Sequence, residues 1–222
     1  MKNNTIAIDL AKSVFQVTGF NPNNEIIFNK RLKRKELTEF IKKQESGRIV
    51  MEACYSSNYW GRTFQNMGHQ VELIPAQHVT PFVRGNKNDA NDALAIFEAS
   101  NRPLIKPVPV KTEAQQAILA LHKVRERLIR NKTSISNQLR GILADFGITP
   151  PRGHKGFETA LSQITSGEID VPEPIFAIVQ LVAVEHLLIK KSLLEINKKI
   201  LESVEKNDSF KILTSIPGVG PL

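Results

Sequence analysis

The sequence contains very little cysteine and no long apolar run. Cys54 is the only cysteine among 222 residues, which excludes an internal disulfide and a cysteine-rich zinc site and favours a reducing compartment. No segment approaches the roughly 18 uninterrupted apolar residues of a membrane-spanning helix. The N-terminal stretch MKNNTIAIDLAK has too short an apolar run for a signal peptide. These absences predict a cytoplasmic protein that is not inserted in a membrane.

Acidic residues are in the minority. The chain has 30 lysines and arginines against 22 aspartates and glutamates, which gives a net charge of +8 and a pI near 9.6. This excess favours polyanionic partners, because lysine and arginine displace condensed counterions from phosphate groups. Nucleic acid is the first expectation and an acidic membrane surface is the second. With 41% hydrophobic and 23% charged residues, the composition is that of a soluble globular protein.

The first half of the chain has the pattern of an α/β domain. Three short segments rich in β-branched or aromatic residues are predicted strands, with the turn-forming stretch NPNNE between the second and the third. Helices and strands then alternate, which implies parallel pairing and right-handed crossovers. This order predicts a ribonuclease-H-like fold, which actin-like kinases share. The predicted strands are 5–10, 14–20, 25–31, 48–53 and 70–76, and the predicted helices are 35–44 and 58–68.

The second half of the chain is helical in pattern. It follows NRPLIKPVPV, whose prolines suit an extended connector. Apolar residues recur at three- and four-residue steps from Ile118 to Phe146 and again from Ile175 to Val204. A stretch punctuated by glycine and proline separates the two runs, and Pro150 with Pro151 is expected to end the first. We predict two long amphipathic helices that pack as an antiparallel hairpin or pair with the hairpin of another subunit.

Four acidic residues are expected to meet at one edge of the predicted sheet. Asp9 ends the first predicted strand and Glu52 ends the fourth, and these strands are neighbours in this fold. Asp89 and Asp92 are three residues apart and share one face of the following predicted helix. Four carboxylates repel one another unless a cation neutralises them, and ligation by oxygen alone suits Mg²⁺ or Mn²⁺. For the two helix residues, the alternative is an ordinary helix start, where negative side chains are favoured.

Glycine-rich turns are missing where a kinase would need them. Actin-like phosphotransferases use such turns to bring backbone N–H groups close to nucleotide phosphates. Here the first strand continues as DLAKSVF, without glycine, and there is no Walker-type loop. Phosphodiester chemistry on nucleic acid is therefore favoured, since a pair of metal ions can activate a nucleophile and stabilise the leaving oxygen.

Four stretches of the chain resemble, in the same order, the DEDD insertion-sequence transposases. This family is also called the bridge-RNA-guided recombinases, and the pilin-gene invertase is a relative. The subgroup with subterminal inverted repeats is the most similar, judged by EAC, YW and GNKNDANDA. The resemblance runs through essentially the whole chain. It is carried by IAIDLAKSVFQV, the stretch from VMEACYSSNYW to NKNDANDALAIFEA, QQAILALHKVRERLIRNKTSISNQLRGILADFGI and the terminal LTSIPGVGPL.

The resemblance implies a RuvC-like domain at residues 1–110, whose catalytic and metal-binding tetrad is Asp9, Glu52, Asp89 and Asp92. It implies a coiled-coil arm at 111–208 that assembles dimers or tetramers, followed at 209–222 by the start of a helix-hairpin-helix-like C-terminal domain. The family's serine nucleophile lies in that domain, which is expected to be cut short here. The implied partners are double-stranded DNA, as element ends and target, and a noncoding guide RNA in the bacterial cytoplasm.

Basic residues outside the acidic cluster are candidate contacts to nucleic acid. Arg84 and Lys87 precede the helix aspartates, and loop solvation is the alternative reading. Several basic residues lie on the first long helix away from its apolar stripe, where few acidic residues are expected to pair with them. The run KRLKRK at 30–35 either follows a phosphate backbone or is a solvated junction. The predicted contacts are Lys12, Arg84, Lys87, Arg125, Arg127, Arg130, Lys132 and Arg140.

Three isolated side chains have a structural and a functional interpretation. Tyr59 and Trp60 are expected to begin a helix and pack into the sheet, and the alternative is a stacking platform for bases. His186 falls on the apolar stripe of the second long helix. Without a second ligand at metal-binding spacing, it is expected to be a satisfied interfacial histidine.

Three functional hypotheses follow from the sequence. The first is a metal-dependent, RNA-guided DNA transposase or site-specific recombinase that here lacks its serine domain. The second is an inactive fragment that acts as a nucleic-acid-binding or oligomerisation module. The third is a stand-alone nuclease similar to junction resolvases. Function resides in the completed site, so the fold alone does not choose among them.

Overall fold

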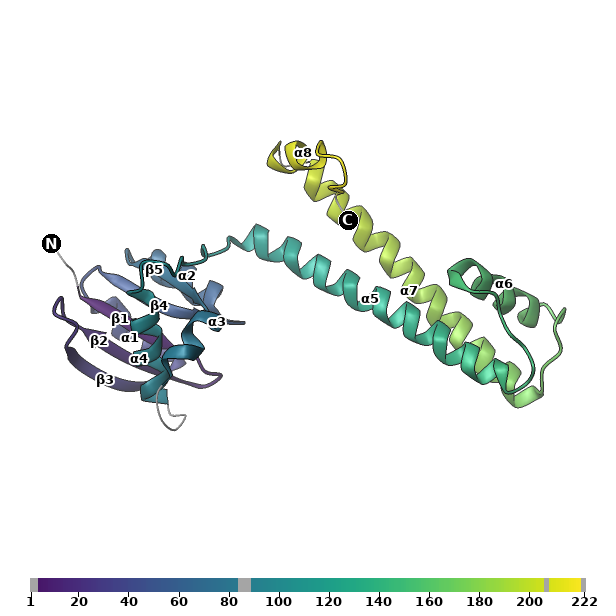
Figure 1. Ribbon diagram of the computed structural model, residues 1–222, viewed down its shortest axis with the longest axis horizontal. Coiled ribbons are helices and arrows are strands. Elements are labelled where there is room, and N and C mark those ends of the chain that lie inside the picture. The colour runs from purple at the N-terminus through teal and green to yellow at the C-terminus, as the bar shows by residue number, and fades with distance from the viewer. Residues whose placement is uncertain (1–3, 84–88, 206–207, 221–222) are drawn as a thin grey trace. The chain divides into compact units, whose positions relative to one another are not determined.

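The computed structural model describes residues 4–83, 89–205 and 208–220 and divides into two compact units, Met1–Glu113 and Ala114–Leu222 (Figure 1). The first unit is α/β and the second is helical. The elements of the first are β1 (Thr5–Asp9), β2 (Val14–Phe20), β3 (Ile26–Lys33), α1 (Arg34–Lys42), β4 (Arg48–Ala53), α2 (Ser57–Gln65), β5 (Gln70–Pro75), α3 (Ala76–Val79), the 3₁₀ helix η1 (Thr80–Phe82) and α4 (Asp89–Ser100).

One mixed sheet forms the centre of the α/β unit. Its strand order is β3-β2-β1-β4-β5. β1 pairs antiparallel with β2, and β2 pairs antiparallel with β3, whereas β4 is parallel to both β1 and β5. The meander therefore supplies one side of the sheet and the crossovers supply the other. This is the order predicted from the sequence, so the ribonuclease-H-like fold is confirmed.

The central strands are covered on both faces, which explains their continuous apolar sequences. Ala7 and Ile8 of β1 and Ile49, Val50 and Met51 of β4 are all fully buried. A strand with helices on both sides needs apolar residues at consecutive positions instead of alternating ones. The outer strand β3 has one side of its backbone exposed, and it carries the basic run, as edge strands commonly do.

Two helical layers cover the sheet (Figure 1). On one face, Leu37 of α1 and Trp60 of α2 belong to the same core as Phe15. On the other face, Ile96 of α4 packs with Val50 in a second core. Alternation along each strand sends successive side chains to opposite faces and so divides the sheet residues between the two cores.

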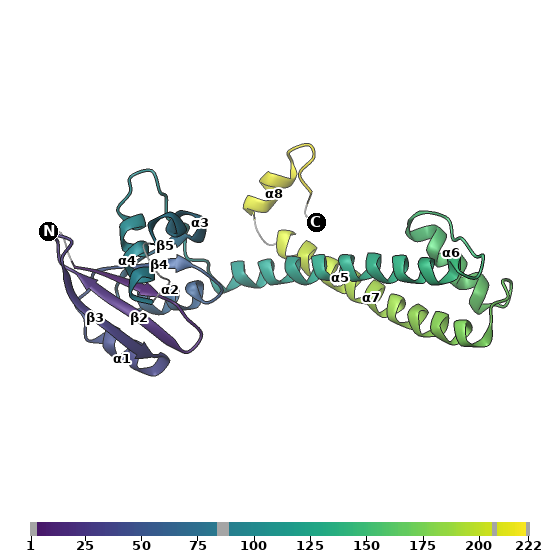
Figure 2. The same cartoon turned by 60° about the horizontal axis from the view of Figure 1, so that its bottom comes forward.

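Two long helices make up most of the helical unit, whose elements are α5 (Glu113–Ala144), α6 (Gly153–Thr165), α7 (Glu173–Glu205) and α8 (Asp208–Thr214). Figure 2 shows α5 and α7 as an antiparallel pair with α6 at the closed end. Leu128 and Ile135 of α5 pack with Ile189 of α7 between the long helices. Both long helices confirm the prediction. In the part of the chain that the structure describes, no helix combines the length and apolar character that a membrane crossing requires.

Two local features of the helical unit differ from the prediction. The segment between the long helices was expected to consist of turns, but it contains α6, whose Phe157 and Ile164 are buried. α5 was expected to run to the prolines, but it ends at Ala144. Gly147 has a φ of 75°, and its N–H donates to the Ala144 carbonyl at 3.0 Å, so a left-handed glycine ends the helix.

Candidate active site

Asp9 and Glu52 are placed side by side by the strand register. Ile8 of β1 is in register with Met51 of β4, so the next residues along these parallel strands are Asp9 and Glu52. Neighbouring strands lie about 4.8 Å apart. Ile8 and Met51 both belong to the core under α1 and α2. Alternation therefore places Asp9 and Glu52 on the opposite face, which α4 covers. Both residues are half-buried.

The first turn of α4 reaches the same edge. Arg48, at the start of β4, donates to the Ser100 carbonyl at 2.8 Å and to Oδ1 of Asn101 at 3.0 Å, so the end of α4 lies beside the start of β4. The 12 residues of α4 span about 18 Å. The 6 residues of β4 span about 20 Å. α4 therefore crosses the sheet, and its first turn, which includes Asp92, lies at the edge where β4 ends. We call this the acidic edge: the ends of β1 and β4 and the first turn of α4.

The structure describes three of the four predicted acidic side chains. Asp92 is half-buried, whereas the side chain of Asp89 lies outside the described residues. Among the side chains that the structure describes, no three histidine, cysteine, aspartate or glutamate groups form a cluster able to hold a metal ion. Asp9, Glu52 and Asp92 are all described, so their side chains do not form such a cluster in this structure, although the strand register and the path of α4 bring their backbones to one edge. An all-carboxylate donor set at that edge has the chemistry that a hard divalent cation prefers.

The predicted nucleic-acid contacts of the first unit are only partly described. Lys12 is exposed in the loop between β1 and β2, three residues after Asp9, so it lies at the acidic edge. Arg84 and Lys87 lie outside the described residues. The position of Lys12 suits contact with a phosphate that approaches the acidic edge, because an ammonium group is a compact charge on a flexible stem.

Two arginines predicted to bind nucleic acid hold the helical unit together. Arg125 Nε donates to Oδ1 of Asn197 at 2.9 Å and so joins α5 to α7. Arg140 Nη2 donates to the carbonyls of Pro151 and Gly153, and its guanidinium lies 5.2 Å from the ring centroid of Phe157. Arg140 therefore ties α5 to the segment that begins α6. These contacts give both side chains a structural role.

The other basic residues of α5 differ in their surroundings. Nη1 of Arg130 lies 3.4 Å from Oε1 of Glu126 in an exposed ion pair. Nζ of Lys132 lies 4.0 Å from Oε1 of Glu158. The expectation that few acidic residues pair with this helix is therefore wrong at these two positions. Arg127 is exposed and has no ion pair with any described residue. It is the α5 arginine most available to an external phosphate.

Glu158 is the centre of a charge cluster where α6 packs on the long helices. Its carboxylate accepts a hydrogen bond from Lys190 Nζ at 2.9 Å, and this bond holds the pKa of Glu158 below 4.5. Nε2 of His186 lies 3.9 Å from the same carboxylate. Burial lowers the pKa of His186 against the opposing attraction of Glu158. This nitrogen has no hydrogen-bond partner among the described residues, so the prediction of a satisfied histidine is wrong.

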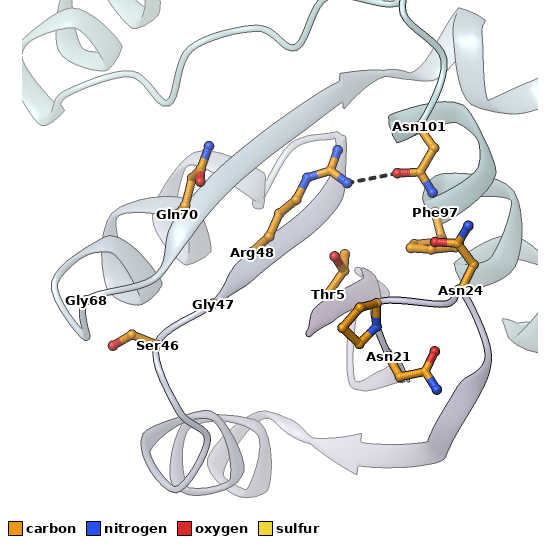
Figure 3. Close-up of a pocket in the computed structure, with 11 residues that line it drawn as sticks. Thr5, Asn21, Asn24, Ser46, Gly47, Arg48, Gly68, Gln70, Phe97 and Asn101 are labelled. Atoms are coloured by element: carbon orange, nitrogen blue, oxygen red, sulfur yellow. Dashed lines mark hydrogen bonds between the residues drawn. The ribbon is translucent and has the colours of Figure 1, made fainter. Parts of the chain in front are cut away.

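A cavity of about 630 Å³ lies at the opposite edge of the sheet, where β4 begins (Figure 3). Asn21, Gln70 and Asn101 are among its lining residues. The guanidinium of Arg48 turns toward Asn101 and also donates to both carboxylate oxygens of Glu72, at 3.0 and 2.8 Å. Most of its donors are therefore used to join β4, β5 and the end of α4. The cavity is separated from the acidic edge by the length of the strands.

The sequence patterns did not predict the exposure of two tyrosines near the acidic edge. Tyr55, three residues after Glu52, was not singled out, and it is 74% exposed. Tyr59 was expected to pack into the sheet but is 54% exposed, whereas Trp60 is buried as predicted. The four-residue spacing of Trp60 and Phe64 marks the buried face of α2 and leaves Tyr59 off it. That spacing was the signal available in the sequence.

The strand order and the acidic edge define a ribonuclease-H-like domain with carboxylates at the ends of its central strands. A family model described as a transposase, of the DEDD type of the IS110 group, matches residues 6–148. The chain belongs to this DEDD transposase family.

Curated relatives agree with this assignment. The transposase for insertion sequence element IS1111A of Coxiella burnetii is 38% identical over 218 residues, and a putative transposase, y4pF/y4sB, of Sinorhizobium fredii is 38% identical over 217. A probable family 20 transposase of Pseudomonas aeruginosa is 34% identical over 219 residues. These alignments cover 98% of this chain but 60%, 56% and 65% of the respective relatives. The chain thus spans a little under two thirds of their length.

Two solved structures are similar to part of this chain. They are a Thermus thermophilus RuvC structure and T. thermophilus RuvC in complex with Holliday junction substrate. Both have a TM-score of 0.33, with 11% and 12% sequence identity, and the match covers 47% of this chain and 99% of RuvC.

Proposed function

We propose that this chain supplies the metal-dependent centre of an insertion-sequence transposase that acts on DNA phosphodiester bonds. The proposed metal ligands are Asp9, Glu52, Asp89 and Asp92, and the proposed cation is Mg²⁺ or Mn²⁺. One observation supports the proposal most: β1 and β4 end side by side, and the first turn of α4 begins near the same edge of the sheet. Family membership adds to it, because the matched region includes all four residues.

The residues at the acidic edge have separate proposed roles in metal binding and in attracting the nucleic acid. Asp9 and Glu52 stand on the two central strands, which are rigid because both are buried in the sheet. Asp92 comes from a helix whose first-turn N–H groups favour negative charge. A bound divalent cation neutralises these carboxylates and stabilises charge on phosphodiester oxygens. The exposed Lys12 then attracts the backbone of the incoming strand.

Calorimetric titration of Mn²⁺ into the chain tests the metal site. We expect the parent to bind and Asp9→Asn and Asp92→Asn each to weaken binding by about 10-fold or more, since each removes one anionic ligand. Asp145→Asn is the matched control, because Asp145 is an exposed aspartate in the helical unit. Equal Mn²⁺ affinity in all four proteins would refute the metal assignment.

The finer parts of the proposal are RNA guidance and completion by a serine-bearing domain. Both rest on the family resemblance, and the basic, exposed Lys12 and Arg127 are compatible with a nucleic-acid partner. Sequencing of RNA that co-purifies with a complete transposase tests the guide. The expected result is enrichment of one structured RNA encoded beside the gene, and RNA in proportion to its cellular abundance would contradict it.

A second proposed property is self-association through α7. Leu181, Val184 and Leu188 follow one another at steps of three and four residues, which places them on one side of the helix. They are 72%, 60% and 59% exposed. An apolar row of this size on a surface helix marks a protein contact, and its spacing is that of a coiled-coil seam. The proposed occupant is the same row on a second copy, as in a symmetric dimer.

The molar mass of the chain in solution tests this contact. We expect a dimer or larger assembly for the parent and a monomer for a Leu181→Glu, Leu188→Glu double variant, because opposed carboxylates would repel across the seam. Leu104→Glu is the control, since Leu104 is 95% exposed in the first unit. A monomeric parent at micromolar concentration would contradict the proposal.

A further inference from the structure

The only two tyrosines of the chain are both exposed at the acidic edge. Tyr55 lies in the turn after β4, three residues beyond Glu52, and Tyr59 lies in the first turn of α2. Their exposed fractions are 74% and 54%. Neither ring is needed to fill the core, which Trp60 and Phe64 fill from the same helix. Two uncovered rings beside the proposed site therefore need an explanation outside folding.

Tyr59 is held in place by a buried aromatic neighbour. The ring centroids of Tyr59 and Trp60 are 5.2 Å apart in an edge-to-face arrangement. Trp60 is 1% exposed and makes a second edge-to-face contact with Phe15 on β2. Edge-to-face pairs of this kind are favourable. The position of Tyr59 is thus fixed by the core, and its outer surface is ready to accept a second ring.

Basic side chains continue from the tyrosines toward β3. The guanidinium of Arg34 lies 5.2 Å from the ring centroid of Trp60, and Tyr59 contacts the same ring. Arg34 has Lys33 and Lys35 beside it, and all three line a cavity of about 400 Å³. Among the described residues, neither lysine forms an ion pair. Glu36, the one acidic lining residue, accepts the backbone N–H of Lys33 at 2.7 Å and is used as a helix cap.

The strand ends place this basic group at the acidic edge. Val14, the first residue of β2, pairs with Lys33, the last of β3, and Asp9 pairs with Gln16 two residues further along β2. Lys33 is therefore at the same edge of the sheet as Asp9, two strands away. Two strand spacings amount to about 10 Å. This is a short distance compared with a few nucleotides of extended backbone.

We infer that this edge binds an unpaired nucleic-acid strand. Bases stack on Tyr55 and Tyr59, and phosphates contact Lys33, Arg34 and Lys35, so that the strand runs along the edge of the sheet at which β1 ends. A base inside a duplex has its faces covered by its neighbours and cannot use an exposed ring, whereas every unpaired base can. The combination of rings with cations is what distinguishes this surface from a site for duplex phosphates alone. The inference rests on the proposed function and adds its substrate class.

Fluorescence anisotropy tests this with labelled oligonucleotides of about 12 nucleotides, a length within the usual range for single-strand sites. The probes are single-stranded DNA, single-stranded RNA and duplex DNA of one sequence. Tyr55→Ala and Tyr59→Ala are each expected to weaken single-strand binding by roughly 5- to 100-fold. Duplex binding is expected to stay within about 2-fold, because it depends on phosphate contacts. The tighter of the two single strands identifies whether DNA or RNA is the ligand.

Three control variants separate stacking from other effects. Tyr55→Phe keeps the ring and is expected to bind like the parent. Leu104→Ala removes an exposed apolar side chain near the end of α4, at the opposite edge, and is expected to change nothing. A Lys33→Gln, Lys35→Gln double variant is expected to weaken single-strand and duplex binding together and to lower the salt dependence of both.

All oligonucleotide titrations are done with EDTA, so that strand binding is measured without the metal site. Mn²⁺ titration of the aspartate variants tests the metal site, and oligonucleotide titration of the tyrosine variants tests the strand site. Either proposal can therefore fail without the other. The inference is overturned if the tyrosine variants bind single strands as tightly as the parent, or if the parent shows no affinity for single strands above that for duplex.

Discussion

The two units of this chain expose different kinds of side chain. At the acidic edge of the α/β unit, the exposed residues include lysines, an arginine and two tyrosines, and the large aliphatic residues of β1 and β4 are buried. On α7 the pattern is reversed, and a row of aliphatic residues stays exposed. The most exposed are Leu181, Leu194, Leu187, Val184 and Leu188. The first surface suits a charged polymer with aromatic bases, and the second suits another protein helix.

The comparison also shows that positive charge does not by itself mark a nucleic-acid site. In the helical unit, Arg125 and Arg140 are bound by Asn197 and by backbone carbonyls. At the acidic edge, Lys33 and Lys35 have no ion-pair partner among the described residues. Basic side chains already engaged within the fold lose their contacts if they turn to a phosphate. The availability of a basic side chain is therefore a better guide to nucleic-acid contact than its charge alone.

The largest expected effect is at Asp9. In a complete transposase, Asp9→Asn is expected to reduce DNA strand exchange to background and leave the circular dichroism spectrum unchanged, because a half-buried strand-end carboxylate is replaced by an amide of equal size. Arg127→Gln in the helical unit is the contrasting variant and is expected to retain activity at low salt. Strand exchange at the parental rate with Asp9→Asn would contradict the proposal that the α/β unit holds the catalytic carboxylates.

The next effect compares a buried and an exposed leucine in the helical unit. Leu139 is fully buried near α6, and Leu188 is 59% exposed on α7. Leu139→Ala is expected to lower the free energy of unfolding of this unit by about 2–5 kcal/mol, because it leaves a cavity. Leu188→Ala is expected to change it by less than about 0.5 kcal/mol in dilute, monomeric solution. Urea denaturation followed by circular dichroism measures both. Equal losses would mean that Leu188 packs within its own chain.

The sequence predicted most of the fold because periodicity reports burial. Strands covered on both faces read as short apolar runs, and the helices of the hairpin read as stripes three and four residues apart. α6 was missed for a physical reason: Gly153 and Gly156 lie in its first turn just after two prolines, so its local composition is that of a loop. Its stability comes from packing Phe157 against the hairpin, which no local pattern shows.

Part of the candidate site was also predictable from the sequence pattern. The positions of Asp9 and Glu52 at strand ends follow from the strand order, which the sequence implies. The partner of Arg125 does not, because Asn197 is 72 residues away in the chain and only the crossing of α5 with α7 brings them together. Exposure of Tyr55 likewise depends on what the turn after β4 leaves uncovered. Local sequence patterns therefore do not predict contacts that depend on tertiary packing.

A smaller effect is expected at Arg140. Arg140→Lys keeps the charge but cannot reproduce a planar group that lies against Phe157 and donates to two carbonyls. We expect a loss of about 1–2 kcal/mol in the stability of the helical unit. Arg127→Lys, on the same helix, is expected to have no measurable effect, because Arg127 is exposed. Denaturation midpoints of the two variants provide the test, and equal midpoints would show that the Arg140 contacts contribute nothing.

The smallest effect expected is a pH dependence of the stability of the helical unit. Burial lowers the pKa of His186 below its ordinary value of 6.5, so the unfolded chain takes up a proton before the folded one does as the pH falls. Stability is therefore lost below about pH 6.5. The lysines that face this histidine, Lys132 and Lys190, act in the same direction, and Glu158 opposes them.

Glu158 makes the stability of the helical unit depend on pH in a second, lower pH range. Its pKa is held below 4.5, chiefly by the hydrogen bond from Lys190, so its contribution is present above pH 4.5 and is lost as the pH falls through the folded-state pKa. His186→Leu is expected to remove only the loss of stability that His186 causes at the higher pH range. It is expected to leave stability at neutral pH unchanged or higher, since Nε2 has no hydrogen-bond partner among the described residues. Thermal unfolding of the chain at about pH 7 and about pH 5.5 compares the parent with this variant. If both lose stability equally between these values, another group titrates there, and the loss does not originate at His186.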